Sequence, residues 1–344
     1  MTKGIVTFKP RQVTKTLLSV LSHRAQDILK KRYGLGDLSD RMTLESIGKE
    51  YGITRERVRQ IENFAISSIR RAAAFGNAQP VFDELKTVMQ EYGTVVKEKD
   101  FLEYLSQDPS YQNHIHFLLV LGDYFEKLRE DDQFHHRWTV DKNVSDKIER
   151  SIISLYKELS DDELVLEGDM LARFLGHIKK DLKHVEDIIL ARRWLMLSKL
   201  VNVNPLGEWG RANSPNVRAR GIRDLAYLVL RNHGSPMHFR EVALAIGKKF
   251  NKKAHEATVH NELIKDKRFI LVGRGLYALS EWGYERGVVR EVIRQILTRE
   301  GPLTKNELIE KVMKERHVKE NTVLVNLQNS KYFRKDKKGR YAPV

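Results

Sequence analysis

The feature of the sequence that most constrains its fold is the segment 44–62, where two helical patterns meet at a glycine. Apolar residues recur at three- and four-residue spacing over Leu44–Tyr51 and again over Arg55–Arg71, with Gly52 between the two stretches. That spacing is typical of helices that bury one face. Two such helices joined by a short glycine-containing turn predict a helix-turn-helix.

The second of these helices has an apolar side and a polar side. Thr54 is a good N-cap residue for it. Its apolar residues are spaced at i, i+3, i+7 and i+11, and are expected to face the core: Val58, Ile61, Ala65 and Ile69. The other side, near the start of the helix, consists of Arg55, Glu56, Arg59 and Gln60.

The start of such a helix is where recognition helices meet the edges of DNA bases. Arginine pairs with guanine and glutamine with adenine through two hydrogen bonds, and glutamate accepts one from cytosine. A charged helix face exposed only to water is the alternative interpretation. The cap at Thr54, the turn and the types of polar residue together favour DNA recognition.

Residues 14–72 resemble region 4 of the sigma-70 family of bacterial transcription initiation factors. The run Thr-Arg-Glu-Arg-Val-Arg-Gln-Ile-Glu at 54–62 is close to the recognition-helix signature of that family, and the segments 28–35 and 44–48 match as well. The resemblance implies that this helix reads the promoter −35 element, with base contacts from Arg55, Glu56 and Gln60. It also implies docking on the flap of core RNA polymerase, and phosphate contacts from Thr54, Arg57 and Arg59.

The sequence departs from a complete sigma factor. In that family an aromatic-rich region that melts the −10 element comes before region 4, whereas about 13 residues precede the match in this sequence. We therefore expect neither that region nor promoter melting from this chain.

A second pattern, three helices followed by a short hairpin, recurs after residue 80. It covers 81–140 and is found again at 222–280 and 289–341. This order is typical of winged-helix domains, and unrelated helical bundles with stray strands are the alternative. The stretch 146–221 is helical and shows no clear wing, so a degenerate winged helix is one interpretation of it.

Within the stretch 222–280, the segments 236–242, 257–263 and 268–279 resemble the HARE-type helix-turn-helix. This winged-helix module occurs in the delta subunit of some bacterial RNA polymerases and in restriction-associated and chromatin proteins. The resemblance implies contact with nucleic acid or polymerase. Secondary contacts are expected from the third helix and the wing tip: Thr258, His260, Asn261 and Arg274. Local capping or packing of His260 and Asn261 is the alternative.

The hairpin of the last unit is rich in basic residues. Cations in a wing suit contacts to the DNA backbone, and this wing contains Lys335, Lys337, Lys338 and Arg340. A solvated tail loop is the alternative interpretation.

We therefore predict a mainly α fold, with a sigma region 4-like helix-turn-helix domain followed by several winged-helix-like domains with short β-hairpin wings. The expected domains are a helix-turn-helix at 1–76, a winged-helix-like domain at 77–145, a helical, degenerate winged-helix candidate at 146–221, the HARE-type domain at 222–283 and a C-terminal winged-helix-like domain at 284–344.

Charge favours nucleic-acid contacts at the two ends of the chain rather than in its middle. The 344 residues carry a net charge of +15. Residues 1–75 contribute +8 and residues 221–344 contribute +12, whereas residues 76–220 contribute −5. A polyanion is therefore expected at the ends, and protein partners at the acidic middle.

Other classes of protein are excluded by what the sequence lacks. It has no cysteine, which removes disulfides, thiolate nucleophiles and Cys-based zinc sites. No stretch approaches the roughly 18 apolar residues of a membrane span, and no Walker or nucleophile-elbow motif occurs. The histidine pairs at 114/116 and 135/136 are interpreted as ordinary surface or interface histidines. We expect no enzyme activity, no metal and no cofactor.

Together these features predict a DNA-binding transcription factor or RNA polymerase accessory protein that reads −35-like promoter DNA and modulates transcription initiation. Its expected partners are double-stranded promoter DNA and core RNA polymerase, with no membrane, and its expected location is the cytoplasm, on the nucleoid. The alternative is an RNA polymerase- or protein-interaction scaffold that binds nucleic acid without sequence specificity. A restriction-linked enzyme would need a carboxylate cluster for a divalent metal, which the sequence lacks.

Overall fold

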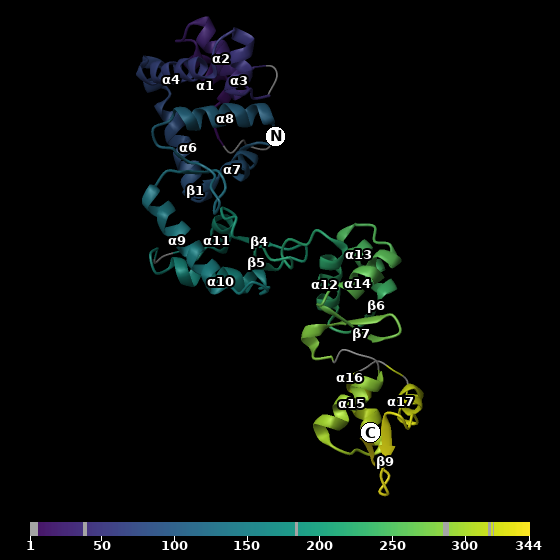
Figure 1. Ribbon diagram of the computed structural model, residues 1–344. Helices are drawn as coiled ribbons and strands as arrows, with labels where there is room; N and C mark the ends of the chain where they lie inside the picture. Colours follow the sequence, from purple (N-terminus) through teal and green to yellow (C-terminus); the bar gives the residue numbers. More distant parts are fainter. Residues whose placement is uncertain (1–5, 37–39, 183–184, 285–288, 316–317, 319) are drawn as a thin grey trace. The chain divides into compact units, whose positions relative to one another are not determined.

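The computed structural model describes residues 6–36, 40–182, 185–284, 289–315, 318 and 320–344 (Figure 1). The chain divides into two compact units, Met1–Asn202 and Val203–Val344. Both are built from helices and small antiparallel sheets, so the predicted mainly α fold is confirmed. Among the described residues, no helix is long and apolar enough to cross a membrane.

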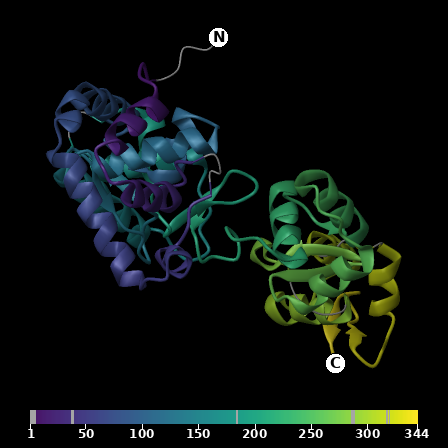
Figure 2. The ribbon, with the colours of Figure 1, turned by 90° about the horizontal axis from the view of Figure 1, so that it is seen from above.

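The first unit begins with a helical bundle, seen from above in Figure 2. Its helices are α1 (Pro10–Leu18), α2 (His23–Tyr33), α3 (Leu44–Tyr51), α4 (Arg55–Arg71) and α5 (Ala73–Asn77). The ends of α3 and α4 agree with the sequence pattern because local caps fix them. The Thr43 hydroxyl accepts a hydrogen bond from the Ser46 amide at 3.1 Å, and the Thr54 hydroxyl accepts one from the Arg57 amide at 3.1 Å.

The turn between α3 and α4 depends on two glycines. Gly52 ends α3 with a φ of 61°, a left-handed conformation that glycine adopts without steric cost. A Cβ atom on Gly48 would lie 2.7 Å from the carbonyl oxygen of Ile53, so the two helices meet only because that atom is missing. Ile28, Ile47 and Val58 form the small core beneath this helix-turn-helix.

A winged-helix order of elements follows. It consists of α6 (Gln79–Tyr92), β1 (Val95–Lys97), α7 (Glu98–Leu105), α8 (Pro109–Leu121), β2 (Glu126–Leu128) and β3 (Arg137–Thr139). The strands form one antiparallel sheet in the order β1-β3-β2. The hairpin predicted at the end of the stretch 81–140 is thus present, and β1, the strand after α6, pairs with β3 at the edge of the sheet.

The helix α8 joins this winged-helix segment to the helical bundle, and lies beside α1 and α4 in Figure 1. It is apolar on nearly every side and buried from Asn113 to Leu119, as expected of a helix without a polar face. The ring centroids of Tyr33 on α2 and Phe117 on α8 are 5.0 Å apart. One hydrophobic core contains residues of both segments. The boundary expected at 76/77 therefore separates two segments that share a core.

The next segment contains α9 (Lys142–Glu158), α10 (Glu167–Ile178), α11 (Ile188–Leu195), β4 (Val201–Val203) and β5 (Trp209–Arg211). The helix α9 crosses the boundary expected at 145/146. The strands β4 and β5 pair, although the sequence showed no clear wing here. Gly207 supplies the turn with a φ of 84° and Trp209 is buried, so the Gly-Glu-Trp-Gly run at 207–210 forms the turn and the start of β5.

The second unit contains two copies of the winged-helix order of elements. Its first copy has α12 (Ile222–His233), β6 (Met237–His238), α13 (Phe239–Phe250), α14 (Glu256–Lys265), β7 (Phe269–Gly273) and β8 (Leu276–Leu279), with sheet order β6-β8-β7. A 3₁₀ turn, η1 (Ser280–Trp282), follows.

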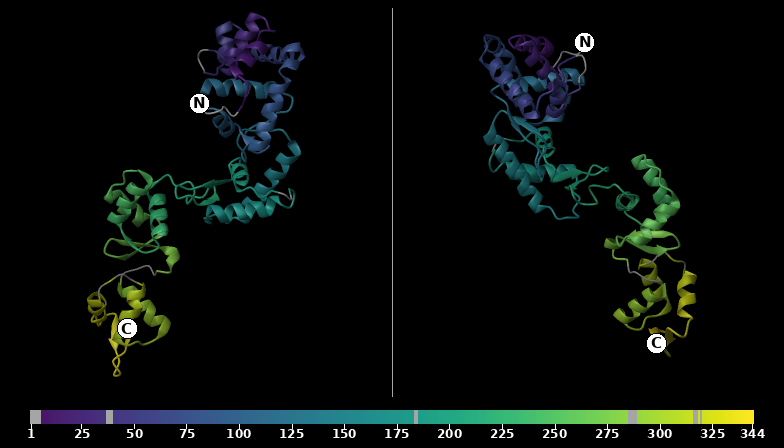
Figure 3. Two further views of the ribbon diagram at one scale, coloured as in Figure 1. Left: turned by 180° about the vertical axis from the view of Figure 1, so that it is seen from behind. Right: turned by 45° about the horizontal axis from the view of Figure 1, so that its top comes forward.

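The second copy has α15 (Val289–Glu300), α16 (Lys305–Glu315), α17 (Glu320–Leu327), β9 (Phe333–Lys335) and β10 (Tyr341–Pro343). A capping box is present at the start of α16: the Thr304 amide donates to the Glu307 carboxylate at 2.8 Å, and the Glu307 amide donates to the Thr304 hydroxyl at 3.5 Å. Leu303 forms an isolated bridge with Tyr341, in the place of a first strand. The hairpin β9–β10 closes the copy (Figure 3).

Candidate nucleic-acid interface

The first turns of α4 present the polar residues that the sequence singled out. Thr54, Arg55, Glu56, Arg57, Arg59 and Gln60 are all exposed. The apolar stripe lies on the other side of the helix: Val58, Ala65 and Ile69 are fully buried, and Ile61 is partly buried against the core. Because the apolar side of α4 packs on the core, its polar side faces solvent.

Most of these polar groups are already paired along the helix. Arg59 donates two hydrogen bonds to the Glu56 carboxylate, at 2.8 and 2.7 Å. The Arg57 guanidinium donates to Oε1 of Gln60 at 3.1 Å. The hydrogen bonds from Arg59 lower the pKa of Glu56 below its ordinary value, so its carboxylate is charged at neutral pH. These pairs join four exposed side chains in the first turns of the helix.

Arg55 differs from its neighbours. It makes no hydrogen bond or ion pair with the part of the chain that the structure describes. Arg55 is the first residue of α4 and comes before the paired side chains in the chain. All the side-chain donors of Arg55 are therefore open to an external acceptor, such as the N7 and O6 atoms of guanine.

Of the residues expected to contact nucleic acid from α14 and its wing, some are exposed and one packs against a neighbouring ring. Thr258 and Asn261 are exposed on α14, and Arg274 is exposed at the turn between β7 and β8. His260 instead stacks on Phe239 with ring centroids 4.5 Å apart and an interplanar angle of 23°. Local packing, the alternative left open for His260, is what the structure shows for its ring.

The basic residues of the last hairpin are also divided. Lys335, Lys337 and Lys338 are exposed. Arg340 is half-buried, and its Nε lies 3.0 Å from the Asp336 carboxylate, which also accepts hydrogen bonds from the amides of Lys338 and Arg340. Asp336 thus shapes the tip of the hairpin and leaves three lysines for solvent or a polyanion.

The interpretation of His114 and His116 as surface or interface residues is wrong, because both are buried. They lie on α8, which is covered on both sides, and Nε2 of His116 lies 3.5 Å from the Glu98 carboxylate and 3.3 Å from Nζ of Lys127. Burial lowers the pKa of each imidazole below its ordinary value. No group of three or more metal-ligating side chains occurs among the described residues.

Sequence reasoning missed the contacts that hold the helix-turn-helix on α8. Nε of Arg41 donates to Oδ1 of Asn113 at 2.7 Å, and the Asn113 amide donates to the Gly34 carbonyl at 3.0 Å. Arg70 on α4 donates to the carbonyls of Val120 and Leu121, both at 3.0 Å. The run Phe-Leu-Leu-Val-Leu at 117–121 was the available signal, since five successive apolar residues on a helix require cover on every side.

Comparison with known proteins assigns two segments of the chain. Residues 17–71 match the family described as sigma-70, region 4. Residues 221–282 match the HARE-HTH family, an HTH domain whose description names ASXL and restriction endonuclease. The two segments contain the helix-turn-helix α3–α4 and the winged copy α12–β8.

Curated relatives are similar over the first segment. The chain is 38% identical over 71 residues to the RNA polymerase principal sigma factor HrdD of Streptomyces viridifaciens, which is 21% of this chain and 21% of that protein. It is 49% identical over 61 residues to the RNA polymerase sigma factor SigA1 of Synechococcus elongatus, which is 17% of this chain and 15% of that protein. The match spans about a fifth or less of the length of these relatives.

The remainder of those sigma factors has no counterpart in these matches, so the likeness concerns the helix-turn-helix. The two assigned segments agree with the resemblances seen in the sequence. The chain thus carries a sigma-70 region 4 helix-turn-helix at 17–71 and a HARE-type helix-turn-helix at 221–282, two domains of DNA-binding, transcription-related types that are typical of non-enzymes.

Proposed function

We propose that this protein reads promoter DNA through the start of α4 and modulates transcription initiation together with core RNA polymerase. The observation that carries the proposal is the exposed face of Arg55, Glu56 and Gln60 on a helix that belongs to a sigma-70 region 4 segment. In this role Arg55, Glu56 and Gln60 contact base edges. Thr54, Arg57 and Arg59 contact phosphates.

The pairs along α4 are compatible with this role. Exposed ion pairs contribute little to stability in water, so Arg59 and Glu56 exchange partners readily when a phosphate or a base arrives. A bidentate contact to a base discriminates by about 1–3 kcal/mol. The ion pairs therefore cost little to replace when α4 meets DNA.

Polymerase contact is proposed on a surface other than the one that α8 covers. The winged segment packs on α1 and α2 and ties to α4 through Arg70, and that side is closed to a partner. Secondary contacts to nucleic acid are proposed for Thr258, Asn261 and Arg274, and for Lys335, Lys337 and Lys338. His260 and Arg340 are weaker candidates because each already has a partner in the fold. In this role the protein works on the nucleoid, in the cytoplasm.

Selection of binding sites from random duplex DNA tests the proposal. The full chain is expected to enrich a motif, and the Arg55→Ala/Gln60→Ala double variant is expected to lose it. The control is Ser110→Ala in the first turn of α8, which should enrich the same motif as the natural chain. If the natural chain enriches no motif, sequence reading is excluded, and a scaffold that binds DNA without specificity through its basic ends takes its place.

Purification of the full chain with core RNA polymerase tests the partner. Retention of the natural chain and of the Arg55→Ala/Gln60→Ala variant alike would support a polymerase contact that is separate from the DNA face. Absence of retention for both would leave DNA as the partner and remove polymerase from the proposal.

A further inference from the structure

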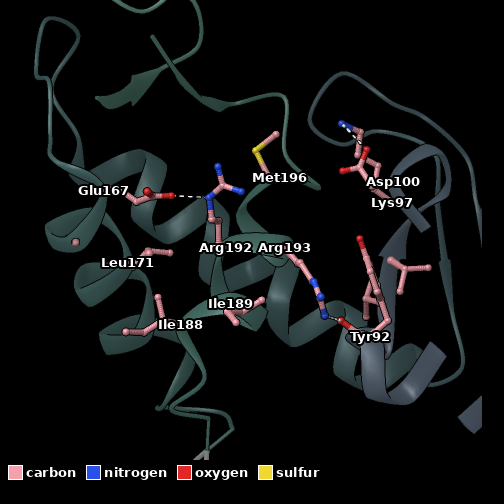
Figure 4. A pocket seen from close by; sticks show the side chains of 13 residues that line it. Tyr92, Lys97, Asp100, Glu167, Leu171, Ile188, Ile189, Arg192, Arg193 and Met196 are labelled. Atoms are coloured by element: carbon pink, nitrogen blue, oxygen red, sulfur yellow. Dashed lines mark hydrogen bonds and ion pairs between the residues drawn. The ribbon is translucent and has the colours of Figure 1, made fainter. Parts of the chain in front are cut away.

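In a helix-turn-helix, the helix after the turn enters the major groove of DNA. The third helix has this place in the winged-helix order of elements, and two of these helices are engaged elsewhere in the fold. The helix α8 is buried along most of its length. The helix α11 lines a groove with α10 and β1 (Figure 4), where Arg192 pairs with Glu167 at 2.5 Å and Arg193 lies 4.0 Å from the ring centroid of Tyr92. The arginines of α11 therefore already have partners.

The third helix of the last copy, α17, differs because one of its sides is exposed and uncharged. Val323 and Leu327 of α17 are buried in the core of this copy. Val325, on the other side, is 65% exposed. The exposed side continues just past the end of the helix and consists of Thr322, Val325, Gln328 and Asn329. Methyl groups, a hydroxyl and amides are the groups that contact thymine methyls and the edges of adenine.

The amides of this side have hydrogen-bonding capacity to spare. Oδ1 of Asn329 accepts a hydrogen bond from the Lys331 amide at 3.2 Å, which leaves the NH₂ group of the Asn329 side chain as a donor. The side-chain amide of Gln328 makes no hydrogen bond with any residue that the structure describes. Both its donor and its acceptor are therefore open to N7 and N6 of adenine.

The charges of the last copy are distributed unevenly. Residues 289–315, which form α15 and α16, carry a net charge of +1. Several cations there are paired with carboxylates, such as Arg299 with Glu315 at 3.1 Å and Lys314 with Glu310 at 2.7 Å. Residues 330–344 carry a net charge of +5. Five cations of this segment make no ion pair with any described residue, and so attract a polyanion: Lys331, Arg334, Lys335, Lys337 and Lys338.

The helix α17 and this basic hairpin are fixed to each other. Phe333 of β9 is buried in the same core as α17. The amides of Tyr332 and Phe333 donate to the Asn329 carbonyl at 3.0 and 3.2 Å. The Arg290 guanidinium of α15 lies 4.1 Å from the ring centroid of Tyr332. A helix and a basic wing held in one arrangement can contact base edges and phosphates at the same time.

We propose that α17 is a second base-reading helix, which reads A·T base pairs in the major groove while the hairpin β9–β10 contacts the neighbouring phosphates. The methyl groups of Val325 contact the thymine methyl, and the Gln328 amide pairs with adenine. The family matches end at residue 282 and assign no role to α17. This inference rests on the proposed binding of the chain to duplex DNA, but not on base reading by α4.

Selection from random duplex DNA tests the inference in a chain that lacks the reading residues of α4. The full-length Arg55→Ala/Gln60→Ala variant should still enrich a short motif rich in A·T pairs. Adding Val325→Ala/Gln328→Ala should remove this motif. In fluorescence anisotropy, the ratio of the affinities for the selected duplex and for a shuffled duplex should fall by at least about tenfold on that addition.

The thymine methyl allows a test of the contact itself. Uracil in place of thymine in the selected duplex removes the methyl group that Val325 contacts. Val325→Ala should therefore weaken binding to the thymine duplex several-fold, and should leave binding to the uracil duplex unchanged. Equal losses on the two duplexes would show that Val325 does not contact this methyl group.

Matched controls separate base reading from general effects on the last copy. Met313→Ala, at a 48% exposed position of α16, should change neither the motif nor the affinities. Lys337→Ala should weaken the selected and the shuffled duplex alike, because a phosphate contact does not depend on sequence. Circular dichroism of the Val325→Ala/Gln328→Ala chain should match that of the natural chain.

The outcomes distinguish this inference from the proposed function. If every enriched motif requires Arg55 and Gln60, reading by α17 is overturned and reading by α4 stands. If the enriched motif requires Val325 and Gln328 alone, α17 is supported and α4 is removed as a reader. A motif that survives both pairs of changes would assign base reading to another part of the chain and would overturn the inference for α17.

Discussion

The helices α4 and α8 have similar places in their segments but lie in opposite environments. Each follows a helix of eight residues, α3 before α4 and α7 before α8, and each has a capped first turn, by Thr54 and by Asp108. In α4 the apolar residues form one stripe, and the polar side remains in solvent. In α8 the apolar residues surround the helix, and seven successive residues from Asn113 to Leu119 are buried.

The difference shows that a winged-helix order of elements does not by itself bring a helix to DNA. The width of the apolar surface decides whether a helix is a reader or a support. In this chain α8 takes the place of a recognition helix in its segment, yet it packs beneath the helix-turn-helix. The first winged segment therefore acts as a platform that fixes α4.

The largest effect is expected from removing a side chain of this platform. Phe117→Ala should lower the free energy of unfolding by about 3–5 kcal/mol, as is usual for a buried phenylalanine. Because Phe117 packs on Tyr33, hydrogen exchange should speed up in α2 as well as in α8. Mass spectrometry of peptides from the full chain measures both.

Phe64→Ala is the control for this change. Phe64 lies on α4 and is 68% exposed, so its removal should alter the exchange of neither helix. Loss of protection in α8 without any in α2 would contradict the shared core, and would make the helix-turn-helix a separate folding unit.

A smaller effect is expected from the polar contact between the two segments. Arg41→Ala removes the hydrogen bond from Nε to Asn113, while much of the arginine is in contact with water. We expect a loss of about 1 kcal/mol, seen as faster exchange in α3. Arg11→Ala breaks the exposed ion pair with Asp108 and should have no measurable effect. Equal effects of the two changes would show that the Arg41 contact does not hold the segments together.

The reading helix could be predicted from the sequence because its determinants are local. Thr43, Thr54 and Gly52 fix the ends of α3 and α4 within a few residues, and the apolar stripe of α4 fixes which side is exposed. The family likeness added the roles of individual residues. None of this required knowledge of contacts made at long range.

The role of α8 could not be predicted because its contacts are distant in the sequence. Arg41 and Asn113 are 72 residues apart, and no local pattern pairs them. The hairpin β4–β5 was missed for a different reason. Its second strand, Trp209–Arg211, has glycines at 207 and 210 on either side of Trp209, and glycines in so short a run indicate a turn rather than a strand.

The buried histidines of α8 make the platform sensitive to acid. Burial, with help from the nearby cations Arg41 and Lys127 and against Glu98, lowers the pKa of His116, so the native state keeps it neutral. The unfolded chain binds a proton near pH 6.5 and below. Stability therefore falls as the pH drops below that value.

His116→Gln should reduce this dependence between pH 7 and pH 5, followed by hydrogen exchange in α8. It should not abolish it, because burial also lowers the pKa of His114. His233→Gln, at an exposed position of α12, should leave the dependence as in the natural chain. A natural chain that gains stability on acidification would show that these imidazoles are charged in the native state.

The smallest effect is expected at the basic hairpin β9–β10, near the C-terminal end of the chain. Lys337 is exposed at its tip, and a lysine there meets a phosphate whatever the sequence. Lys337→Ala should weaken binding to all duplexes alike and should reduce the slope of log K against log salt by about 0.9, the contribution of one phosphate contact. The motif selected by α4 should not change. A loss of affinity that depends on the DNA sequence would mean that this hairpin reads bases too. The distinction between α4, which reads bases, and this hairpin, which contacts phosphates, would then fail.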